Sequence, residues 1–329
     1  MTRRWVVVFV AVVMLLSLVA ISAAQGPVTL QYKYAKDQVV RMHMDLQGSG
    51  SIAPQGGPNM PENMVIPMVM TMNVDLVQKV KEVLPDGSTW LTQNMEKMTM
   101  VQEVMGQKTE MTFEGGKITK LVVNGKEQDP KTMPGLDSQQ SSMGLFTQDA
   151  EYRMEKTGKV LEVKGKVWDY LKKMMPGFDV GALLEASSGS GFLPDHPIPV
   201  GETWKREYAK KMEVPNADPA EFSFLASFKL DSIETAGGMT LAKIPYEQTF
   251  EMANLPLAVP DEKNGPQQMN LQRMKIKAKG ITWFAVEKGQ PSKMDMKMDM
   301  DQTMTINVGE QAMKMSIKMR DLAGTMSVK

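Results

Sequence analysis

The chain has 329 residues, with 38 lysine and arginine side chains against 38 aspartate and glutamate side chains. This balance argues against a nucleic-acid partner, because binding to phosphates needs a basic surface. There is no cysteine and therefore no disulfide. Stability must come from a buried core, which a chain of this length can build.

The first 24 residues have the pattern of a secretory signal peptide. Arg3 and Arg4 precede an apolar run from Trp5 to Ala20, and small residues follow up to Ala24. We expect cleavage after Ala24 and a periplasmic or secreted location. The alternative is an uncleaved anchor, because the run is almost long enough to span a bilayer. Only in that case would the chain contact a membrane, and the remainder would still lie outside the cytoplasm.

Residues 25–150 are predicted to form an N-terminal antiparallel β region, because apolar and polar side chains alternate in several segments. Pro85-Asp86-Gly87-Ser88 is typical of a tight hairpin turn. Gly48–Asn63 is rich in glycine and proline and is expected to be a loop. The expected strands are 28–34, 38–46, a segment through 68–76, 89–101 and 117–123.

Residues 151–198 are predicted to be a linker with a helical insert. Val167–Met175 and Asp179–Ala186 have helix-forming composition and lack the two-residue alternation. Val167, Leu171 and Met174 follow a helical i, i+4, i+7 spacing. We therefore expect these three side chains to cover an apolar β surface.

Residues 199–329 are predicted to form a C-terminal antiparallel β region. The expected strands are 203–212, 222–234, 239–251, 269–286 and a hairpin within 294–319, with 253–268 as a loop. In the hairpin, methionines alternate with charged and polar residues, which predicts one buried and one wet face. A turn centred on Glu310-Gln311 would place Met304 opposite Ile317 and Asp301 opposite Arg320.

Two segments of the C-terminal region resemble segments of the N-terminal region. Val83–Leu91 aligns with Ile233–Leu241 at an offset of 150, and Asp37–Val39 aligns with Glu202–Trp204 at an offset of 165. The alternatives are an internal duplication and chance similarity between hairpins. The predicted fold is mainly β (β-rich α+β), with antiparallel meanders forming curved sheets and a short helical insert.

These features resemble an uncharacterised family of exported bacterial β-rich proteins, known only as a domain of unknown function. The resemblance rests on Tyr32-Lys33-Tyr34 with Lys36-Asp37, the Pro-Asp-Gly turn, Gly201-Glu202-Thr203-Trp204 and Lys288-Gly289. Together they span most of the chain after the signal segment. The resemblance implies export and β structure and no activity.

No catalytic set is recognisable, and we expect no enzyme activity and no cofactor. The chain has two histidines, His43 on the polar side of a predicted strand and His196 in a proline-rich loop. Ser188-Gly189-Ser190-Gly191 lacks the spacing of a nucleophile elbow. Phosphate-loop and calcium-loop motifs are absent as well.

The 33 methionines are the unusual feature. Most are expected to replace aliphatic residues in the core, because the flexible thioether fills irregular gaps. An adaptable apolar surface would also bind a hydrophobic small molecule or an envelope protein. The alternatives are Cu(I) bound by Met-x-Met strands, since thioethers are soft ligands, and a structural envelope protein. The candidate binding residues are Met294, Met296, Met298, Met300, Met313, Met315, Val167, Leu171 and Met174.

Overall fold

A computed structural model describes residues 26–55, 64–130, 144, 147–174, 193–213, 218–259, 267–308 and 311–328. The predicted signal segment and the second predicted helix, 179–186, lie outside this part of the chain. One helix, α3 (Lys166–Met174), is described. The strands are β1 (Val39–Gln55), β2 (Ile66–Val83), β3 (Thr89–Val104), β4 (Gln107–Glu114), β5 (Lys117–Val123), β6 (Lys126–Glu127), β7 (Ala150–Met154), β8 (Val160–Lys164), β9 (Thr203–Met212), β10 (Ala220–Lys229), β11 (Ser232–Ala236), β12 (Met239–Val259), β13 (Gln267–Ala285), β14 (Gln290–Val308) and β15 (Gln311–Val328).

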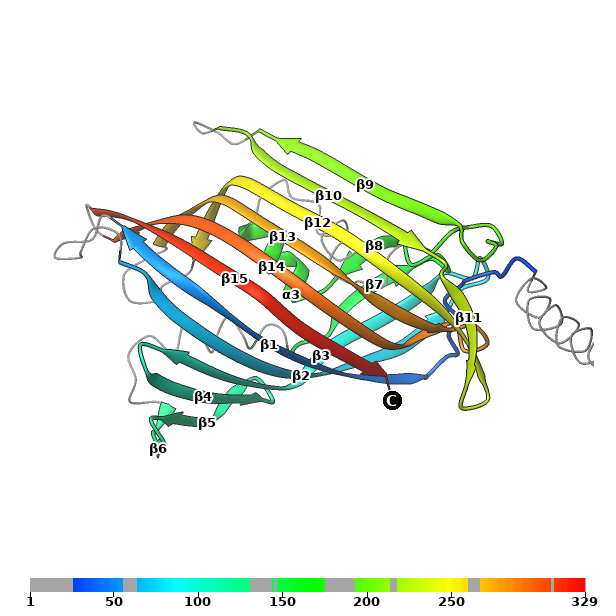
Figure 1. The fold of residues 1–329 in the computed structure, drawn as a ribbon, viewed down its shortest axis with the longest axis horizontal. Coiled ribbons are helices and arrows are strands. Elements are labelled where there is room, and N and C mark those ends of the chain that lie inside the picture. The colour runs from blue at the N-terminus through cyan, green and yellow to red at the C-terminus, as the bar shows by residue number, and fades with distance from the viewer. Residues whose placement is uncertain are drawn as a thin grey trace, which may run out of the picture.

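These strands form one antiparallel sheet, so the mainly β fold is confirmed. Its main path is β6-β5-β4-β3-β2-β1-β15-β14-β13-β12-β10-β9. The strand β1 pairs with β15, which joins the N-terminal and C-terminal β regions in a single sheet. The short strand β7 pairs with the first residues of β3 and with β8. The sheet is strongly curved, and α3, β7 and β8 lie on its concave side (Figure 1).

The two faces of the sheet differ in polarity, because successive side chains of a strand point to opposite faces. We call the concave side the inner face and the other side the outer face. One inner row runs through the register partners Met296, Gly324, Leu46, Met72 and Met100. The neighbouring outer row contains Asp295, Thr325, Asp45 and Asn73, which lie in β14, β15, β1 and β2.

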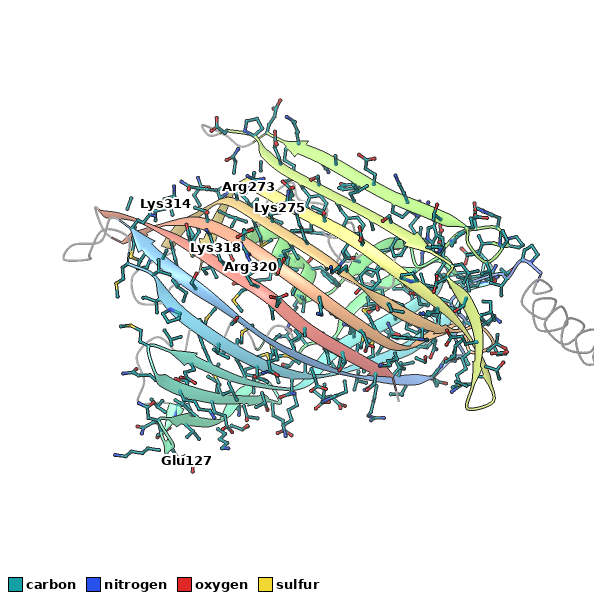
Figure 2. All side chains as sticks on the ribbon, in the orientation of Figure 1. Glu127, Arg273, Lys275, Lys314, Lys318 and Arg320 are labelled. Atoms are coloured by element: carbon teal, nitrogen blue, oxygen red, sulfur yellow. The ribbon has the colours of Figure 1, made fainter. Side chains whose placement is uncertain are left out.

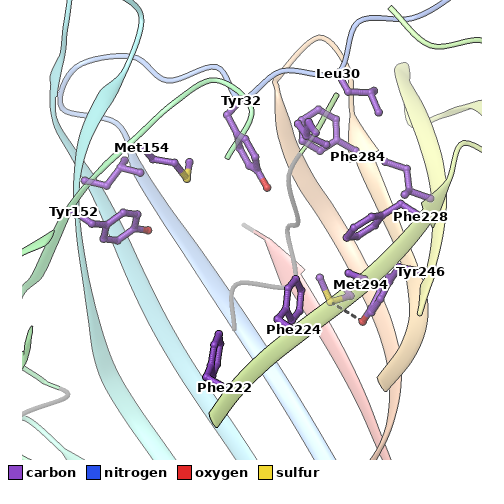
Figure 3. Close-up of a cluster of buried hydrophobic side chains, with 14 of the residues drawn as sticks. Leu30, Tyr32, Tyr152, Met154, Phe222, Phe224, Phe228, Tyr246, Phe284 and Met294 are labelled. Carbon is purple, nitrogen blue, oxygen red and sulfur yellow. Dashed lines mark hydrogen bonds between the residues drawn. The ribbon is translucent and has the colours of Figure 1, made fainter. Parts of the chain in front are cut away.

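On the inner face, aromatic and aliphatic side chains form the largest buried cluster, which we call the aromatic cluster (Figure 3). Phe284 is 1% exposed, and its ring meets Tyr32 edge-on at 5.6 Å between centroids. Phe228 stacks on Trp204 at 5.5 Å. Residues of β2, β3, β7, α3, β9, β10, β12, β13 and β14 contribute to this cluster, so it joins the N-terminal and C-terminal β regions.

The predicted strand 28–34 is wrong, because this segment joins no ladder. Its main-chain amides bond to three separate segments: Val28 to Ile198, Tyr32 to Lys156 and Lys33 to Gly289. Alternate side chains still point inward, and Leu30 and Tyr32 are buried in the aromatic cluster. The alternating pattern therefore arises from an extended segment that crosses the ends of other strands without joining the sheet. We call this segment, residues 28–34, the N-terminal strap.

The expected loop 48–63 is wrong at its start, because β1 continues through Gly48 and Gly50 to Gln55. A Cβ at Gly50 would lie 2.2 Å from the Lys318 carbonyl oxygen, and one at Gly48 would lie 2.8 Å from Cγ of Leu322. The two glycines thus permit a close approach to β15 instead of a turn.

Three further differences concern the middle and second half of the chain. The strands β7 and β8 occupy the start of the region expected to be a linker, around a turn at 156–158. The expected strand 222–234 is divided into β10 and β11. The expected loop 253–268 begins later, because β12 extends to Val259.

The predicted register of the C-terminal hairpin is wrong by two residues. Met304 pairs with Met315, not with Ile317, so the turn lies one residue earlier than predicted. A displacement of two residues keeps every side chain on its predicted face. Arg320 still donates to Asp301, although the direct partner of Asp301 is Lys318.

The two β regions repeat one local arrangement at the start of their first strand. Positive φ angles occur at both Asp37 (64°) and Gly201 (96°). In the N-terminal region, the amide of Asp37 donates to Val80 and the amide of Val80 donates to Gln38. In the C-terminal region, the amide of Gly201 donates to Leu230 and the amide of Leu230 donates to Glu202. Val80 and Leu230 differ by 150, as the sequence alignment predicts, whereas Asp37 and Gly201 differ by 164, one less than the predicted offset of 165. The two β regions therefore share this local arrangement, and the internal duplication stays a prediction.

Candidate functional site

The inner face beyond the aromatic cluster is lined by methionine. There, side chains of β1, β2, β3, β14 and β15 form a second cluster, which we call the methionine cluster. Its buried members are Leu46, Met68, Met319 and Leu322, and its partly buried members are Met44, Ile52, Met70, Met72, Val104, Met296, Met298, Met300 and Ile317. Eight of these thirteen residues are methionine, so thioethers dominate this part of the face.

The register explains why methionines from distant parts of the chain meet here. Met300 pairs with Met319, and Met319 pairs with Gly50 of β1. On the other side of β1, Gly50 pairs with Met68 of β2. Because Gly50 has no side chain, the thioethers of Met319 and Met68 have room above it. The glycine and the methionines are therefore parts of one surface.

The two clusters differ in exposure. In the aromatic cluster, side chains such as Phe284 and Leu230 are almost fully buried. In the methionine cluster, nine of the thirteen residues are only partly buried. Met296 belongs to both clusters and marks their junction. A continuous, partly exposed apolar patch of this kind is typical of a binding surface.

The helix α3 covers the aromatic cluster. Trp168 is 6% exposed, and its indole nitrogen donates to the Glu151 carbonyl oxygen at 2.9 Å, which ties the helix to β7. Val167 is 4% exposed, and Leu171 packs against the aromatic cluster. The expectation that the helix covers an apolar β surface is thus confirmed for Leu171. The Met174 side chain lies outside the part of the structure that is described.

The predicted binding residues do not form one group. Met294 is buried in the aromatic cluster, and Leu171 packs against the same cluster. Met298 and Met300 lie in the methionine cluster, away from the helix. Met313 and Met315 are partly buried but belong to neither cluster. The helix is therefore not a lid over the methionine-rich part of the face.

Sequence reasoning missed the contribution of the N-terminal region to this surface. Met44, Met70 and Met72 lie beside the hairpin methionines only because β1 pairs with β15. Their alternation is visible in the sequence, but the pairing of two strands about 270 residues apart is not. The signal that was available is the shared methionine content of the strands.

Two buried tyrosines stay neutral within the apolar interior. The Tyr246 hydroxyl donates to the Met294 sulfur at 3.4 Å (Figure 3), and burial raises the pKa of Tyr246 to about 12. Burial also raises the pKa of Tyr152 to about 12, against a smaller opposing effect of the hydrogen bond with Gln78. Neither phenol is thereby suited to proton transfer near neutral pH.

On the outer face, His43 lies between two carboxylates. Its ring nitrogens contact Asp75 at 2.7 Å and Asp45 at 3.1 Å, and Asn73 donates to Asp45. The hydrogen bond with Asp75 is the main cause of the raised pKa of His43. Lys97 is the register partner of Asp75 on its other side. Within the described residues, no group of three or more histidine, aspartate or glutamate side chains could hold a metal ion.

We expect the stability contribution of His43 to depend on pH. The raised pKa means that the folded state favours the protonated ring, so this stability is present below the unfolded pKa of about 6.5 and is lost as pH rises through the folded pKa. The difference in unfolding free energy between wild type and His43→Gln should be larger at about pH 5 than at about pH 8. Denaturant melts at both pH values measure it. Because His196 is present in both proteins, its contribution to the pH dependence of stability cancels in this difference. A difference that is equal at the two pH values, or larger at the higher one, would refute the assignment.

No family model and no curated protein matches this chain, which agrees with a resemblance to a family without an assigned activity. Among solved structures, the chain is similar to an outer membrane channel from Pseudomonas putida F1. The identity is 6%, the alignment covers 91% of this chain and 97% of that chain, and the TM-score is 0.22. In the described part of the chain, no helix has the length and apolar character needed to cross a membrane.

Proposed function

We propose that the protein is an exported, non-catalytic binding protein whose methionine cluster holds an apolar molecule or an apolar surface of an envelope protein. The observation that carries the proposal is the partly exposed, continuous methionine surface on the inner face. Methionine suits this role because its unbranched thioether adapts to ligands of varied shape. A stability role alone would favour β-branched side chains in these strands.

The arrangement of the two clusters supports this proposal. The aromatic cluster, together with α3 and the N-terminal strap, supplies a rigid core on the inner face. The methionine cluster then need not be fully buried for the fold to be stable. A rigid scaffold next to an adaptable surface is the general organisation of a binding site.

Native mass spectrometry of the mature protein, purified without detergent, tests the proposal. We expect a population carrying an additional apolar molecule, which solvent extraction would release and identify as lipid-like. Met298→Gln with Met300→Gln should lose this population, because two polar amides then replace thioethers in the cluster. A bare chain for both proteins would contradict binding of a small apolar molecule and favour a structural role.

Binding of Cu(I) is the second candidate, and one row of the inner face favours it. Met294 pairs with Met326, which pairs with Met44, so three soft thioethers lie in one row across β14, β15 and β1. If this candidate is correct, the protein should retain Cu(I) against a competing chelator. Replacing Met294, Met296, Met298 and Met300 by leucine should abolish retention and preserve the fold, since leucine and methionine have similar volumes.

A further inference from the structure

The outer face carries a groove whose lining shares Met296 with the methionine cluster. It has a volume of about 800 Å³ and crosses β9, β10, β12, β13, β14 and β15. Two rows of outward side chains form its walls. The first wall consists of Lys205, Ser227, Glu247, Lys279, Lys297 and Ala323. The second wall consists of Thr203, Lys229, Pro245, Ile281, Asp295 and Thr325. Between them lies a row of inward positions, which consists of Phe228, Tyr246, Gly280, Met296 and Gly324. Five inter-strand spacings make the groove roughly 24 Å long.

The charges on β13 and β14 are complementary except at this groove. The outer face of β13 bears a line of basic residues, of which Arg273 and Lys275 are labelled in Figure 2. Lys275 pairs in register with Asp301 of β14, and Lys277 pairs with Asp299. The next outward residue, Lys279, pairs with Lys297 instead. Like charges that face each other across two strands destabilise a sheet.

This lysine pair is not neutralised by its neighbours. Glu247 is the register partner of Lys279 on β12, but no ion pair joins it to either lysine in the part of the chain described. Asp295, in the other wall, forms an ion pair through Oδ2 with Lys293, whose ammonium group lies 2.9 Å away, and its buried Oδ1 has no hydrogen-bond partner among the described residues. The middle of the groove is therefore positively charged.

Apolar side chains lie next to these charges. Pro245 and Ile281 are register partners in one wall, and Ala323 is the partner of Lys297 in the other. All three lie on a face that is otherwise mainly charged or polar. A volume of about 800 Å³ with apolar walls and a few placed charges is within the range of small-molecule sites.

We propose that this groove binds a fatty acid, with its carboxylate between Lys279 and Lys297 and its chain against Pro245 and Ile281. The carboxylate removes the repulsion between the two ammonium groups and accepts charge-assisted hydrogen bonds from both. The apolar walls bury the chain. The lysines and apolar residues that hold the ligand lie on the outer face, whereas Met298 and Met300 lie on the inner face, so this proposal does not rest on the proposed function.

Calorimetric titration of the mature protein with dodecanoate tests the charge requirement. The wild type should bind, and dodecanol should bind about tenfold more weakly or worse, because it lacks the charge. Lys279→Gln with Lys297→Gln should weaken dodecanoate binding by a similar factor. Lys277→Gln is the matched control, since Lys277 faces Asp299 outside the groove, and it should bind as the wild type does.

A second set of variants tests the location. Ile281→Trp should block the groove and abolish binding, and Ala323→Trp serves if the first variant does not fold. Met298→Gln with Met300→Gln alters the inner face and should leave dodecanoate binding unchanged. Dodecanol bound as tightly as dodecanoate, equal effects of Lys277→Gln and the double lysine variant, or loss of binding only in the methionine variant would each overturn the proposal.

Discussion

Replacing Met319 by aspartate is expected to lower the free energy of unfolding by about 4 kcal/mol or more. Met319 is 2% exposed in the methionine cluster and lies between Met300 and Gly50 in register. The variant loses the burial of a methionine, about 1.5–3 kcal/mol, and places a carboxylate without a partner in an apolar site, which costs about 3–5 kcal/mol where a buried charge is left unpaired.

Asp301→Ala on the opposite face is the matched control for Met319→Asp. Asp301 accepts a hydrogen bond from Arg320, but both side chains are about half exposed. Such a surface ion pair contributes only about 0.2–1 kcal/mol. Denaturant melts of both variants compare the two faces of the same hairpin. Similar losses for the two variants would show that the faces have been assigned wrongly.

Phe284→Ala is expected to cost about 3–5 kcal/mol of unfolding free energy. Phe284 is 1% exposed and contacts Tyr32 of the N-terminal strap edge-on. Its removal leaves a cavity at the point where the strap meets β13, and the closely packed neighbours can fill it only in part. Thermal and denaturant melts should show a large shift in both midpoints.

Leu225→Ala provides the reference for Phe284→Ala. Leu225 is 48% exposed on the outward side of β10, so its truncation should change stability by about 0.5 kcal/mol or less. Equal effects of the two substitutions would mean that the aromatic cluster does not hold the strap and the sheet together.

The sequence allowed us to predict to which face of the sheet each side chain points. It did not allow us to predict which residues of neighbouring strands pair. Alternation at Met294, Met296 and Met298 reports a face directly, because the pleat has a period of two. The partner of Met304 depends on the position of the turn, and a shift of two residues leaves the alternation unchanged. The sequence therefore predicts the hairpin and its polarity but not its register.

Glycine and extended segments misled the prediction for a related reason. Gly48 and Gly50 suggested a loop, because glycine is common in turns. Glycine also occurs where two strands approach closely, and only the position of β15 distinguishes the two cases. Leu30 and Tyr32 alternate as in a strand, but their segment bonds to three distant parts of the chain. Both errors arise from contacts between residues far apart in sequence.

The candidate sites were predictable only in part for the same reason. The hairpin methionines were identified, but their junction with Met44, Met70 and Met72 requires the β1–β15 pairing. The lysine pair of the outer groove, Lys279 and Lys297, becomes visible only when the β13–β14 register is known. A binding surface on a sheet combines side chains from several strands. The sequence gives the order of residues within each strand but not which strands pair.

Titration with a neutral apolar fluorophore, N-phenyl-1-naphthylamine, tests the central claim most directly. The wild type should bind it, and Met298→Gln with Met300→Gln should weaken binding about tenfold or more, because polar amides replace the thioethers that contact it. Val69→Gln, an equivalent change at a side chain 48% exposed on the outer face, should have no effect. Absence of binding by the wild type, or equal binding by all three proteins, would contradict a ligand-binding role for the methionine cluster.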